Sequence, residues 1–452
     1  MSSGNDVAII GAGLSGLTLA LALHQQGIQA TVYESRPAPS NIGGAVMLSP
    51  NALRVLDALS LYRVVEPQGY SFDRLDFRDG EGRVTETYEF GDAAKYGYQG
   101  LRIYRHVLID ALVAVLKEKG IPVVYGRTYS HVVREDGDEG DEGDEGDEGD
   151  EGGAVTFAFE DGTTEMAALL VGADGIHSTV RRHLYPDLQT TFLGMAGITA
   201  AVPTAQLRLP ADGSYHIPVT IAPRNKDKDA SGGGASAFVI APQQPDGSEV
   251  LIGKQRRILE HERAAWEQRG SLADGRAAAV AFLQEGAGPD NYPDIVAHAV
   301  AAIDPAKVNV WPFYVVPKLE RWASAARRVI LLGDAAHAIP PSAGQGINQA
   351  FEDVYMLALL LGWQSKQPKQ PKQPKQASGD GQAQAALDFW QQYRQARVDK
   401  VLELNRQIDL RRMPATDKAF AAGVAREPFD LAWLYKPDFK KDVEDWVAQQ
   451  TK

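Results

Sequence analysis

The residues best suited to chemistry in this sequence are three glycines and an acid near its start. Gly11, Gly13 and Gly16 directly follow an apolar run at 7–10, and Glu34 lies 18 positions after the last of them. The first glycine permits a tight turn, the second lets a pyrophosphate approach the backbone, and the third allows a helix to pack closely on a strand. A carboxylate at the position of Glu34 is placed to accept hydrogen bonds from a ribose. The spacing predicts a dinucleotide site.

A strand, a helix and a second strand must position these residues. Residues 7–10 are a short β-branched run, typical of a buried strand. Leu14 and Ser15 begin a segment of apolar and small residues that suits a helix lying on a sheet, with its first N–H groups facing the anion. Gly27 ends that helix, and residues 30–33 form the next strand. A glycine turn alone could belong to a merely structural βαβ unit, but the whole order favours a dinucleotide site.

Two further strand ends carry acids. The buried run 169–172 leads into Asp174 and Gly175, and the run 328–332 leads into Gly333 and Asp334. Open α/β sheets bind ligands at the carboxyl ends of their strands, which is where both acids are expected. A helix starting near the second of these ends, at the segment GQG of 344–346, is expected to continue to about residue 361.

The glycine segment, LVGADGIHS at 170–178 and GDAAHAIPPSAGQGIN at 333–348 together resemble the single-component FAD-dependent aromatic hydroxylases. This family includes p-hydroxybenzoate and salicylate hydroxylases and the tetracycline-modifying monooxygenases. The resemblance runs from residue 6 to about residue 362. It implies an α/β fold with a Rossmann-like FAD-binding domain, a second, mostly antiparallel sheet that binds the substrate, and C-terminal helices.

The resemblance also implies the reaction. NADH or NADPH binds transiently as the reductant, without a domain of its own, and O2 then adds to the reduced flavin. A flavin C4a-hydroperoxide hydroxylates or epoxidises an aromatic, indolic or polyketide-like small molecule. Two alternatives stay open: a flavin dehydrogenase or reductase of the same fold that inserts no oxygen, and a non-catalytic FAD-fold binding protein. Retention of the GDAAH and GQG segments argues against the second.

Residues carried over from the family to FAD run from its adenosine end to its flavin ring. They are Gly11, Gly13, Leu14, Ser15, Gly16, Glu34, Arg36, Gly44, Ala45, Arg105, Asp174, Asp334, Pro341, Gly344, Gly346 and Ile347. The helix that begins near Gln345 presents its positive end to the flavin, where reduction places negative charge. His337 is expected to be a packed, hydrogen-bonded residue rather than a catalytic base.

The substrate is expected between the second sheet and the flavin. Its candidate wall residues are His216, Phe238, Trp311, Phe313, Tyr314 and Pro317; the alternative for each aromatic residue is an ordinary place in the core. A phenol reacts better when deprotonated, so a cation or a tyrosine against its oxygen would help catalysis. Candidates for that role are Tyr215, Arg224 and Lys254.

Changes in composition along the chain suggest its domain boundaries. The FAD-binding domain is predicted at 1–75, 100–184 and 325–362, the substrate-binding sheet at 76–99 and 185–324, a linker at 363–384 and a helical region at 385–452. Residues 135–151 contain twelve acids and no base in a DEG repeat, which predicts a solvated hairpin loop between strands at 129–133 and 155–159. A KQP repeat at 366–376 reads as a polar linker.

Composition excludes several classes of site. The 452 residues include no cysteine, which rules out disulfides, cysteine-ligated metals and a cysteine-linked flavin, and no pattern predicts a metal site. The net charge of −13 would be −1 without the twelve acids of the repeat, so it indicates no nucleic-acid partner. No apolar run is long enough to cross a membrane and the first strand starts too early for a signal peptide. We expect a cytoplasmic monomer or homodimer, with the two repeats hinting at secondary metabolism.

Overall fold

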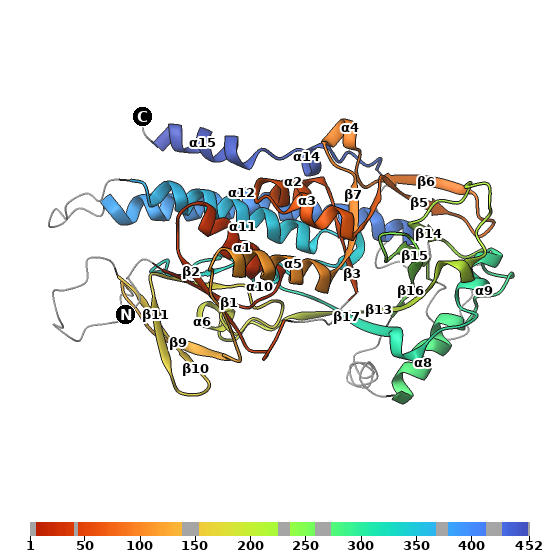
Figure 1. Ribbon diagram of the computed structural model, residues 1–452, viewed down its shortest axis with the longest axis horizontal. Helices are drawn as coiled ribbons and strands as arrows, with labels where there is room; N and C mark the ends of the chain where they lie inside the picture. Colours follow the sequence, from red (N-terminus) through yellow and green to blue (C-terminus); the bar gives the residue numbers. More distant parts are fainter. Residues whose placement is uncertain are drawn as a thin grey trace.

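The computed structural model describes residues 6–39, 44–137, 153–224, 236–257, 273–367, 378–412 and 427–450. Figure 1 shows two parts joined along the long axis. One part holds a parallel sheet covered by helices, and the other holds a larger sheet with helices on its outer side. The C-terminal helices run along the edge of the first part. This is the α/β architecture that the sequence predicts.

The first part is organised on a five-stranded sheet in which all neighbours are parallel. Its strands, in spatial order, are β18 (Val329–Leu331), β12 (Leu169–Gly172), β1 (Val7–Ile10), β2 (Ala30–Glu34) and β8 (Val123–Tyr125). Every residue of β1 is buried, as expected for a strand covered on both faces. Because the strands are parallel, the carboxyl ends of β18, β12, β1 and β2 meet at one edge.

Three helices pack together in this part of the molecule. They are α1 (Leu14–Gln25), α5 (Arg105–Glu118) and α11 (Gly346–Gln364), and α1 contacts both of the others. Leu17, Leu19 and Leu23 are fully buried, so α1 is covered on most of its surface rather than along one stripe. Its small residues allow this close approach. The sequence prediction of a long helix after the GQG segment is confirmed.

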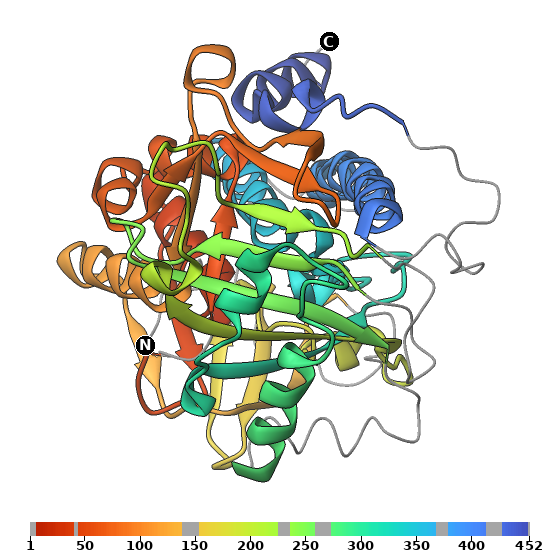
Figure 2. The same ribbon diagram turned by 90° about the vertical axis from the view of Figure 1, so that its right-hand side faces the viewer.

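The second part is a seven-stranded sheet with one parallel pair, β14 with β5; its other pairs are antiparallel. Its strands, in spatial order, are β17 (Val308–Val315), β13 (Thr191–Pro203), β16 (Glu249–Arg257), β15 (Phe238–Pro242), β14 (Val219–Ile221), β5 (Arg74–Arg78) and β6 (Val84–Glu89). Two of its strands therefore come from the segment before α5. Figure 2 views this sheet with α8 (Ala273–Gln284) and α9 (Asp294–Ala299) lying over it.

Two small sheets complete the strands. One has the order β3 (Ala45–Leu48), β7 (Gly100–Tyr104), β4 (Tyr70–Phe72), and the other has the order β11 (Thr164–Ala167), β10 (Val155–Phe159), β9 (Tyr129–Glu135). The antiparallel pairing of β9 with β10 confirms the predicted strands on either side of the DEG repeat. Most of that repeat, and most of the KQP repeat, lies outside the described residues.

The remaining helices are mostly short. They are α2 (Pro50–Ala58), α3 (Tyr62–Val65), α4 (Ala93–Tyr96), α6 (Arg181–Leu184), α10 (Asp334–His337), α12 (Ser378–Arg412), α14 (Ala432–Tyr435) and α15 (Phe439–Gln450), with 3-10 turns η1 (Glu66–Gln68), η2 (Thr204–Leu207), η4 (Pro305–Lys307) and η5 (Pro341–Ala343). The predicted C-terminal region is helical where the structure describes it, although α12 begins inside the segment predicted as linker. Within the described ranges, no helix has the length and apolarity to cross a bilayer.

A buried ion network fixes α12 to α11. Arg394 is fully buried and donates from Nε to Asp353 Oδ1 at 2.8 Å and from Nη1 to Glu352. Arg397 donates to both oxygens of Glu352, from Nε at 2.6 Å and from Nη2 at 2.8 Å. Burial by itself would raise the pKa of Glu352, but the charges of Arg397 and Arg394 outweigh it and hold the pKa below its usual value. Helix α12 is thus part of the same core.

Candidate cofactor and substrate site

All four predicted ligand-binding ends lie at one edge of the parallel sheet. Ile10 is paired with Gly172 and with Tyr33, and Gly172 is paired with Leu331. The glycine turn, Glu34, Asp174 and Asp334 follow these positions directly. Segments more than 300 residues apart in the sequence therefore build a single site, in the place where open α/β sheets bind ligands.

The glycine turn has the shape needed to hold a phosphate. Gly11 has φ +107°, and a Cβ there would lie 2.6 Å from the Ala173 oxygen. A Cβ on Gly16 would lie 2.0 Å from the Gly11 oxygen, so these two glycines close the turn against the fold. A Cβ on Gly13 would have no neighbour within 4 Å. Gly13 is also the N-cap of α1, which has no side-chain cap and no acid in its first turn. Among the described residues, open space thus adjoins a first helical turn whose N–H groups have no side-chain cap.

Glu34 is held against the glycine turn. Its Oε2 accepts a hydrogen bond from the Ala12 N–H at 2.9 Å, and its Oε1 accepts one from the Arg36 N–H at 2.9 Å. The Arg36 guanidinium is exposed and lies 3.8 Å from the same carboxylate. The acid and the base predicted for the adenosine end are therefore neighbours at the end of β2.

Asp174 is half-buried at the end of β12, between the glycine turn and the GDAAH segment. Its Oδ2 accepts from the N–H groups of Thr179 and Val180, at 2.7 and 3.1 Å. Its Oδ1 is buried and has no hydrogen-bond partner in the part of the chain that the structure describes. Burial raises the pKa of this carboxyl. An unpaired buried oxygen at a ligand-binding edge is where a cofactor hydroxyl would fit.

Arg181 links the second motif to the third, a role that sequence reasoning missed. Its Nη2 donates to the Ile176 oxygen at 2.6 Å and its Nη1 to the Ala335 oxygen at 2.8 Å. The side chain is almost fully buried. The sequence around Arg181 does not indicate this link, because Ala335, the more distant of its two partners, lies 154 positions away.

Asp334 is exposed at the strand-end edge and is the first residue of α10. Gly333 before it has φ +58°, and its N–H donates to Asp353 Oδ2 at 3.0 Å. His337 Nε2 is 2.6 Å from the same oxygen, and the imidazole is buried. His337 is therefore packed and hydrogen-bonded, as predicted. The buried network holds the turn that presents Asp334.

The start of α11 lies beside Asp334. A Cβ on Gly346 would be 4.0 Å from Asp334 Oδ1. Gln345 is the N-cap, yet α11 has no side-chain cap and no acid in its first turn. Asn348 fixes the preceding loop by donating to the oxygens of Gly344 and Met47, at 2.7 and 3.0 Å. A second uncapped helix end thus faces the site.

Two more predicted residues lie side by side next to β3 and β7. The Arg105 N–H donates to the Gly44 oxygen at 3.2 Å, and the Arg105 side chain is exposed. A Cβ on Gly44 would have no neighbour within 4 Å, so ligand can approach the backbone there. The residues present fit an FAD: two uncapped helix ends for negative charge, acids for hydroxyl groups and open glycines between them.

The sequence profile of the FAD binding domain matches residues 5–228 and 290–367. The chain belongs to this family. A relative from Streptomyces cremeus, 3-amino-4-hydroxybenzoate 2-monooxygenase, is 26% identical over 95% of this chain and 94% of its own length. A second, phenazine 1,6-dicarboxylic acid hydroxylase from Lysobacter antibioticus, is 30% identical over 79% of this chain and 82% of its own.

Solved structures of similar fold include CtdE in complex with FAD and a substrate. It has a TM-score of 0.71 and 20% identity, with 99% of each chain covered. With the family and its hydroxylase relatives, this confirms the predicted fold, the FAD cofactor and the activity class. The chain is an FAD-dependent monooxygenase of the aromatic hydroxylase type, and NAD(P)H is the usual reductant of that family.

The two faces of the seven-stranded sheet separate the predicted substrate residues. Phe238 and Lys254 are paired across β15 and β16 and share one face. Phe238 is fully buried in the core beneath α8 and α9, and Lys254 Nζ donates to the Glu285 oxygen at 2.7 Å, just after α8. Both side chains thus point away from the FAD-binding part. Their predicted roles at the substrate are not supported.

Tyr215 and Arg224 are also placed elsewhere. Tyr215 packs on the core beneath α8 and α9, with the Arg78 guanidinium 4.0 Å from its ring centre, and burial raises its pKa to about 12. Arg224 Nε donates to the Gly80 oxygen at 2.9 Å, which holds the turn between β5 and β6. None of the three residues proposed to activate a phenol reaches the strand-end site.

The aromatic run of β17 has a different position. Trp311 is paired with Gly197 on β13, and a Cβ on Gly197 would lie 3.3 Å from the Phe313 ring. Alternation along β17 therefore puts both aromatic side chains on the face opposite α8 and α9. The Tyr314 ring is 6.0 Å from that of His177, which lies within the LVGADGIHS segment. Pro317 and His216 are exposed. Phe313 and Trp311, which is 41% exposed, remain candidates for the substrate wall, whereas Tyr314 packs on Phe192 at the edge of the core beneath α8 and α9.

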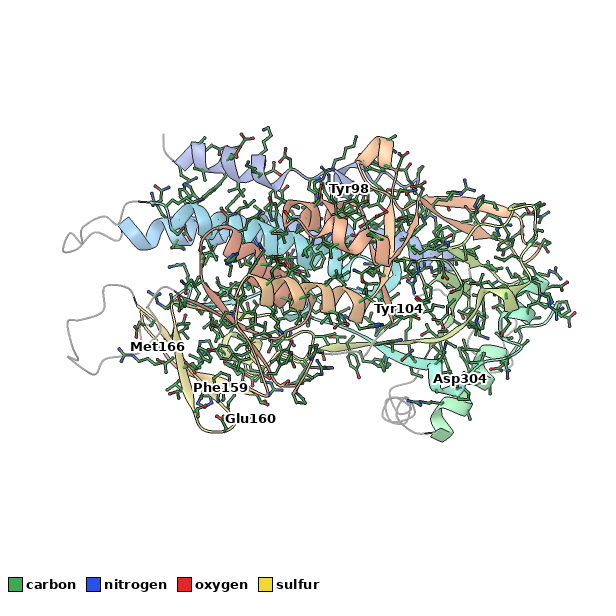
Figure 3. All side chains as sticks on the ribbon, in the orientation of Figure 1. Tyr98, Tyr104, Phe159, Glu160, Met166 and Asp304 are labelled. Atoms are coloured by element: carbon green, nitrogen blue, oxygen red, sulfur yellow. The ribbon has the colours of Figure 1, made fainter. Side chains whose placement is uncertain are left out.

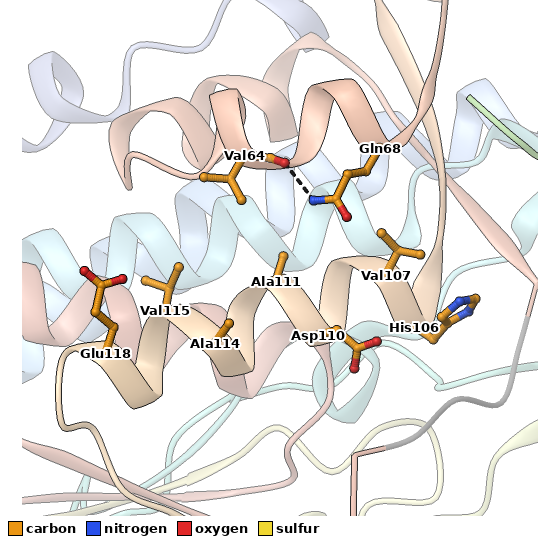
Figure 4. Close-up of a pocket in the computed structure, with 9 residues that line it drawn as sticks. All are labelled: Val64, Gln68, His106, Val107, Asp110, Ala111, Ala114, Val115 and Glu118. Carbon is orange, nitrogen blue, oxygen red and sulfur yellow. Dashed lines mark hydrogen bonds between the residues drawn. The ribbon is translucent and has the colours of Figure 1, made fainter. Parts of the chain in front are cut away.

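Figure 4 shows a groove on the outer surface. It runs between α5 and the α3–η1 segment and carries no convergent polar set. Its lining residues are Val64, Gln68, His106, Val107, Asp110, Ala111, Ala114, Val115 and Glu118. The Gln68 side chain closes on its own turn by donating to the Val64 oxygen at 2.8 Å. We assign no role to this groove.

Substitution by alanine should affect FAD binding at Gly13 and the stability of the fold at Gly16. Gly13→Ala is expected to leave the thermal midpoint of the apoprotein within about 2 °C, because its Cβ meets open space, but to weaken FAD binding by about tenfold or more. Gly16→Ala is expected to destabilise the apoprotein itself by about 2 kcal/mol or more, because its Cβ would lie 2.0 Å from a backbone oxygen. Calorimetry and flavin titration of both variants separate the effects. Equal loss of apoprotein stability in both would contradict this geometry.

Proposed function

We propose that this monooxygenase hydroxylates a small aromatic acid between the strand-end site and the seven-stranded sheet, with NADH or NADPH as reductant. The observation that carries this proposal is the meeting of the glycine turn, Asp174, Asp334 and the start of α11 at one edge. The names of two relatives supply the substrate class, since one acts on a hydroxybenzoate and the other on a dicarboxylic acid. Hydroxylation of indolic or polyketide-like molecules, or epoxidation, remains a broader form of the proposal.

Different residues are proposed to bind different parts of FAD along its length. Gly13 and the α1 N-terminus would hold the pyrophosphate, Glu34 the adenosine ribose and Asp334 the ribityl chain. Arg105 would approach the phosphates beside Gly44. A bound FAD would supply the redox chemistry, namely acceptance of a hydride from NAD(P)H and activation of O2 for transfer to the substrate ring.

Other groups would stabilise charge and exclude water at the flavin-ring end of the cofactor. The uncapped N-terminus of α11 would stabilise negative charge that reduction places on the ring system. The backbone between Pro341 and Ile347 would approach that ring. Phe313 and Trp311 would exclude water from the space facing it, which favours oxygen transfer over loss of the reactive oxygen to solvent.

An isotope experiment tests the function directly. The purified protein should be yellow, and an accepted aromatic acid should raise NADPH or NADH consumption by about tenfold or more, as expected where substrate binding gates the reaction. Under 18O2 the product should carry one labelled oxygen atom. Oxidation of the substrate without label would favour the dehydrogenase alternative. Colourless protein that cannot be reconstituted with FAD would favour a binding protein and would contradict the proposal.

A further inference from the structure

Arg102 is a buried cation whose partner is a neutral amide. Its side chain lies on β7, is 6% exposed, and donates from Nε and Nη2 to Gln243 Oε1, at 3.2 and 2.7 Å. Among the described residues, no carboxylate lies within 4 Å of the guanidinium, and Nη1 makes no hydrogen bond. Arg394, by contrast, is buried against two carboxylates. A buried guanidinium without a counter-charge is costly for the fold.

Burial lowers the pKa of Arg102 to about 10, so the side chain is still charged at neutral pH. The nearby Tyr104 cannot supply the missing charge. Its hydroxyl donates to Glu249 Oε1 at 2.5 Å, and burial raises its pKa further from the neutral range. Lys307 already pairs with the same carboxylate. Arg102 thus has no negatively charged partner among the described residues.

The position of Arg102 connects it with the proposed flavin site. Arg102 is directly paired with Met47 on β3 and Tyr70 on β4, so the three side chains share one face of that small sheet. A Cβ on Gly344 would lie 3.6 Å from the Met47 Cβ, so this face adjoins the loop that leads into α11.

Gln243, on the other side of Arg102, directly follows β15 in the seven-stranded sheet. In Figure 3 the neighbouring Tyr104 marks this junction between the two parts of the molecule, whereas Asp304 marks the outer side. Arg102 therefore stands where the small sheet, the large sheet and the 341–347 loop meet.

We propose that Arg102 binds a carboxylate of the aromatic substrate and thereby selects acids over neutral ring compounds. The planar guanidinium can present Nη1 and Nη2 to two carboxylate oxygens, a geometry that suits paired hydrogen bonds. Gln243 holds the fork in place on its Nε side. Arg102 is thus a specificity residue that touches substrate away from the reacting carbon. The inference rests on the proposed function, since it places the substrate beside the flavin loop.

The test measures binding by the FAD-loaded protein rather than turnover. The probes are benzoate, salicylate, 4-hydroxybenzoate and 3-amino-4-hydroxybenzoate, each compared with its carboxamide, and the readout is the change in flavin absorbance. We expect at least one acid to bind about tenfold or more tightly than its amide. Arg102→Gln should abolish that preference, with amide affinity changed by less than about threefold and flavin content unchanged.

Two further variants separate charge from structure. Arg102→Lys keeps the charge but loses the fork, so it should retain part of the preference for acids, and it serves where Arg102→Gln does not fold. Gln243→Leu removes the amide and leaves the cation, so the preference should persist. If the link between Arg102 and Gln243 were purely structural, Arg102→Gln and Gln243→Leu would lose the preference for acids equally.

The outcomes that overturn the inference are specific to it. Acids that bind no better than amides in the unaltered protein would contradict it, and so would an acid preference that survives Arg102→Gln. Failure of the proposed function would appear elsewhere, as missing flavin or missing 18O in the product. The binding preference is measured without either step of turnover, so the two failures remain distinguishable.

Discussion

Asp334→Ala is expected to yield protein that purifies with less than about a tenth of the FAD bound by the unaltered chain. A hydrogen bond that involves a carboxylate contributes about 1.5–3 kcal/mol, which corresponds to a roughly 10- to 150-fold loss of affinity. The Asp334 carboxylate is exposed at the strand-end edge, beside Gly346, and its turn is fixed independently by Asp353. The fold should therefore survive while the cofactor site is weakened. Flavin absorbance per protein and FAD titration measure the effect.

Asp294→Ala is the matched control. Asp294 is also an exposed acid at the first position of a helix, but α9 covers the outer face of the seven-stranded sheet. The same loss of charge there should leave flavin content unchanged. Full FAD occupancy in Asp334→Ala would refute the role assigned to that residue, and equal depletion in both variants would show a general effect of charge.

Arg394→Met is expected to lower the free energy of unfolding by about 3–5 kcal/mol, the typical cost of removing one member of a buried ion pair. Methionine fills similar space but leaves Asp353 Oδ1 and part of Glu352 without their donor. Trp390 donates from Nε1 to the main-chain carbonyl oxygen of Asp353 at 3.1 Å. Tryptophan fluorescence during denaturation therefore reports on this region. Because Asp353 also holds the turn before Asp334, some loss of FAD affinity should accompany the loss of stability.

Arg406→Met on the same helix provides the comparison. Arg406 is half exposed and lies 3.9 Å from Glu403, so its removal should cost no more than about 0.5 kcal/mol. A similar small cost for Arg394→Met would show that the buried network contributes little to stability.

The effect of Arg394 should depend on pH. Burial tends to raise the pKa values of Glu352 and Asp353, but their positive neighbours outweigh it and the folded pKa values are lowered. The stability from these ion pairs is therefore fully present above the ordinary carboxyl pKa values of 4.5 and 3.8 and is lost as pH falls below them. The difference in stability between the unaltered chain and Arg394→Met should narrow in that acidic range. A difference that grows on acidification would contradict the assignment.

Much of the cofactor site could be predicted from the sequence because each part of it is local. One tight turn requires glycine at three positions, namely Gly11, Gly13 and Gly16, for reasons of backbone geometry. Acids at strand ends are recognisable from the apolar runs that precede them. Parallel pairing then brings those ends together without further information. The family resemblance extended this to residues such as Gly44 and Arg105, which the structure places side by side. Their individual roles toward FAD stay predictions.

The substrate side could not be predicted in the same way. Alternation along a strand is visible in the sequence, but the face that α8 and α9 cover is decided by packing between distant segments. For this reason Phe238 and Lys254 looked as suitable as Phe313, although they lie on the opposite face. The monomeric or dimeric state and the cytoplasmic location also remain predictions.

The sequence by itself determined a dinucleotide site, because short-range glycine and acid patterns encode the turns that hold a dinucleotide, and its resemblance to the aromatic hydroxylases implied FAD and the class of chemistry. Only the tertiary structure brought Arg102 to Gln243, across 141 positions, and left its charge unpaired beside the Gly344 loop. An arginine between buried Leu101 and Ile103 carries no local sign of that position. The physical reason is that binding of a nucleotide backbone relies on local main-chain geometry, whereas choice of substrate relies on side chains that meet only after folding.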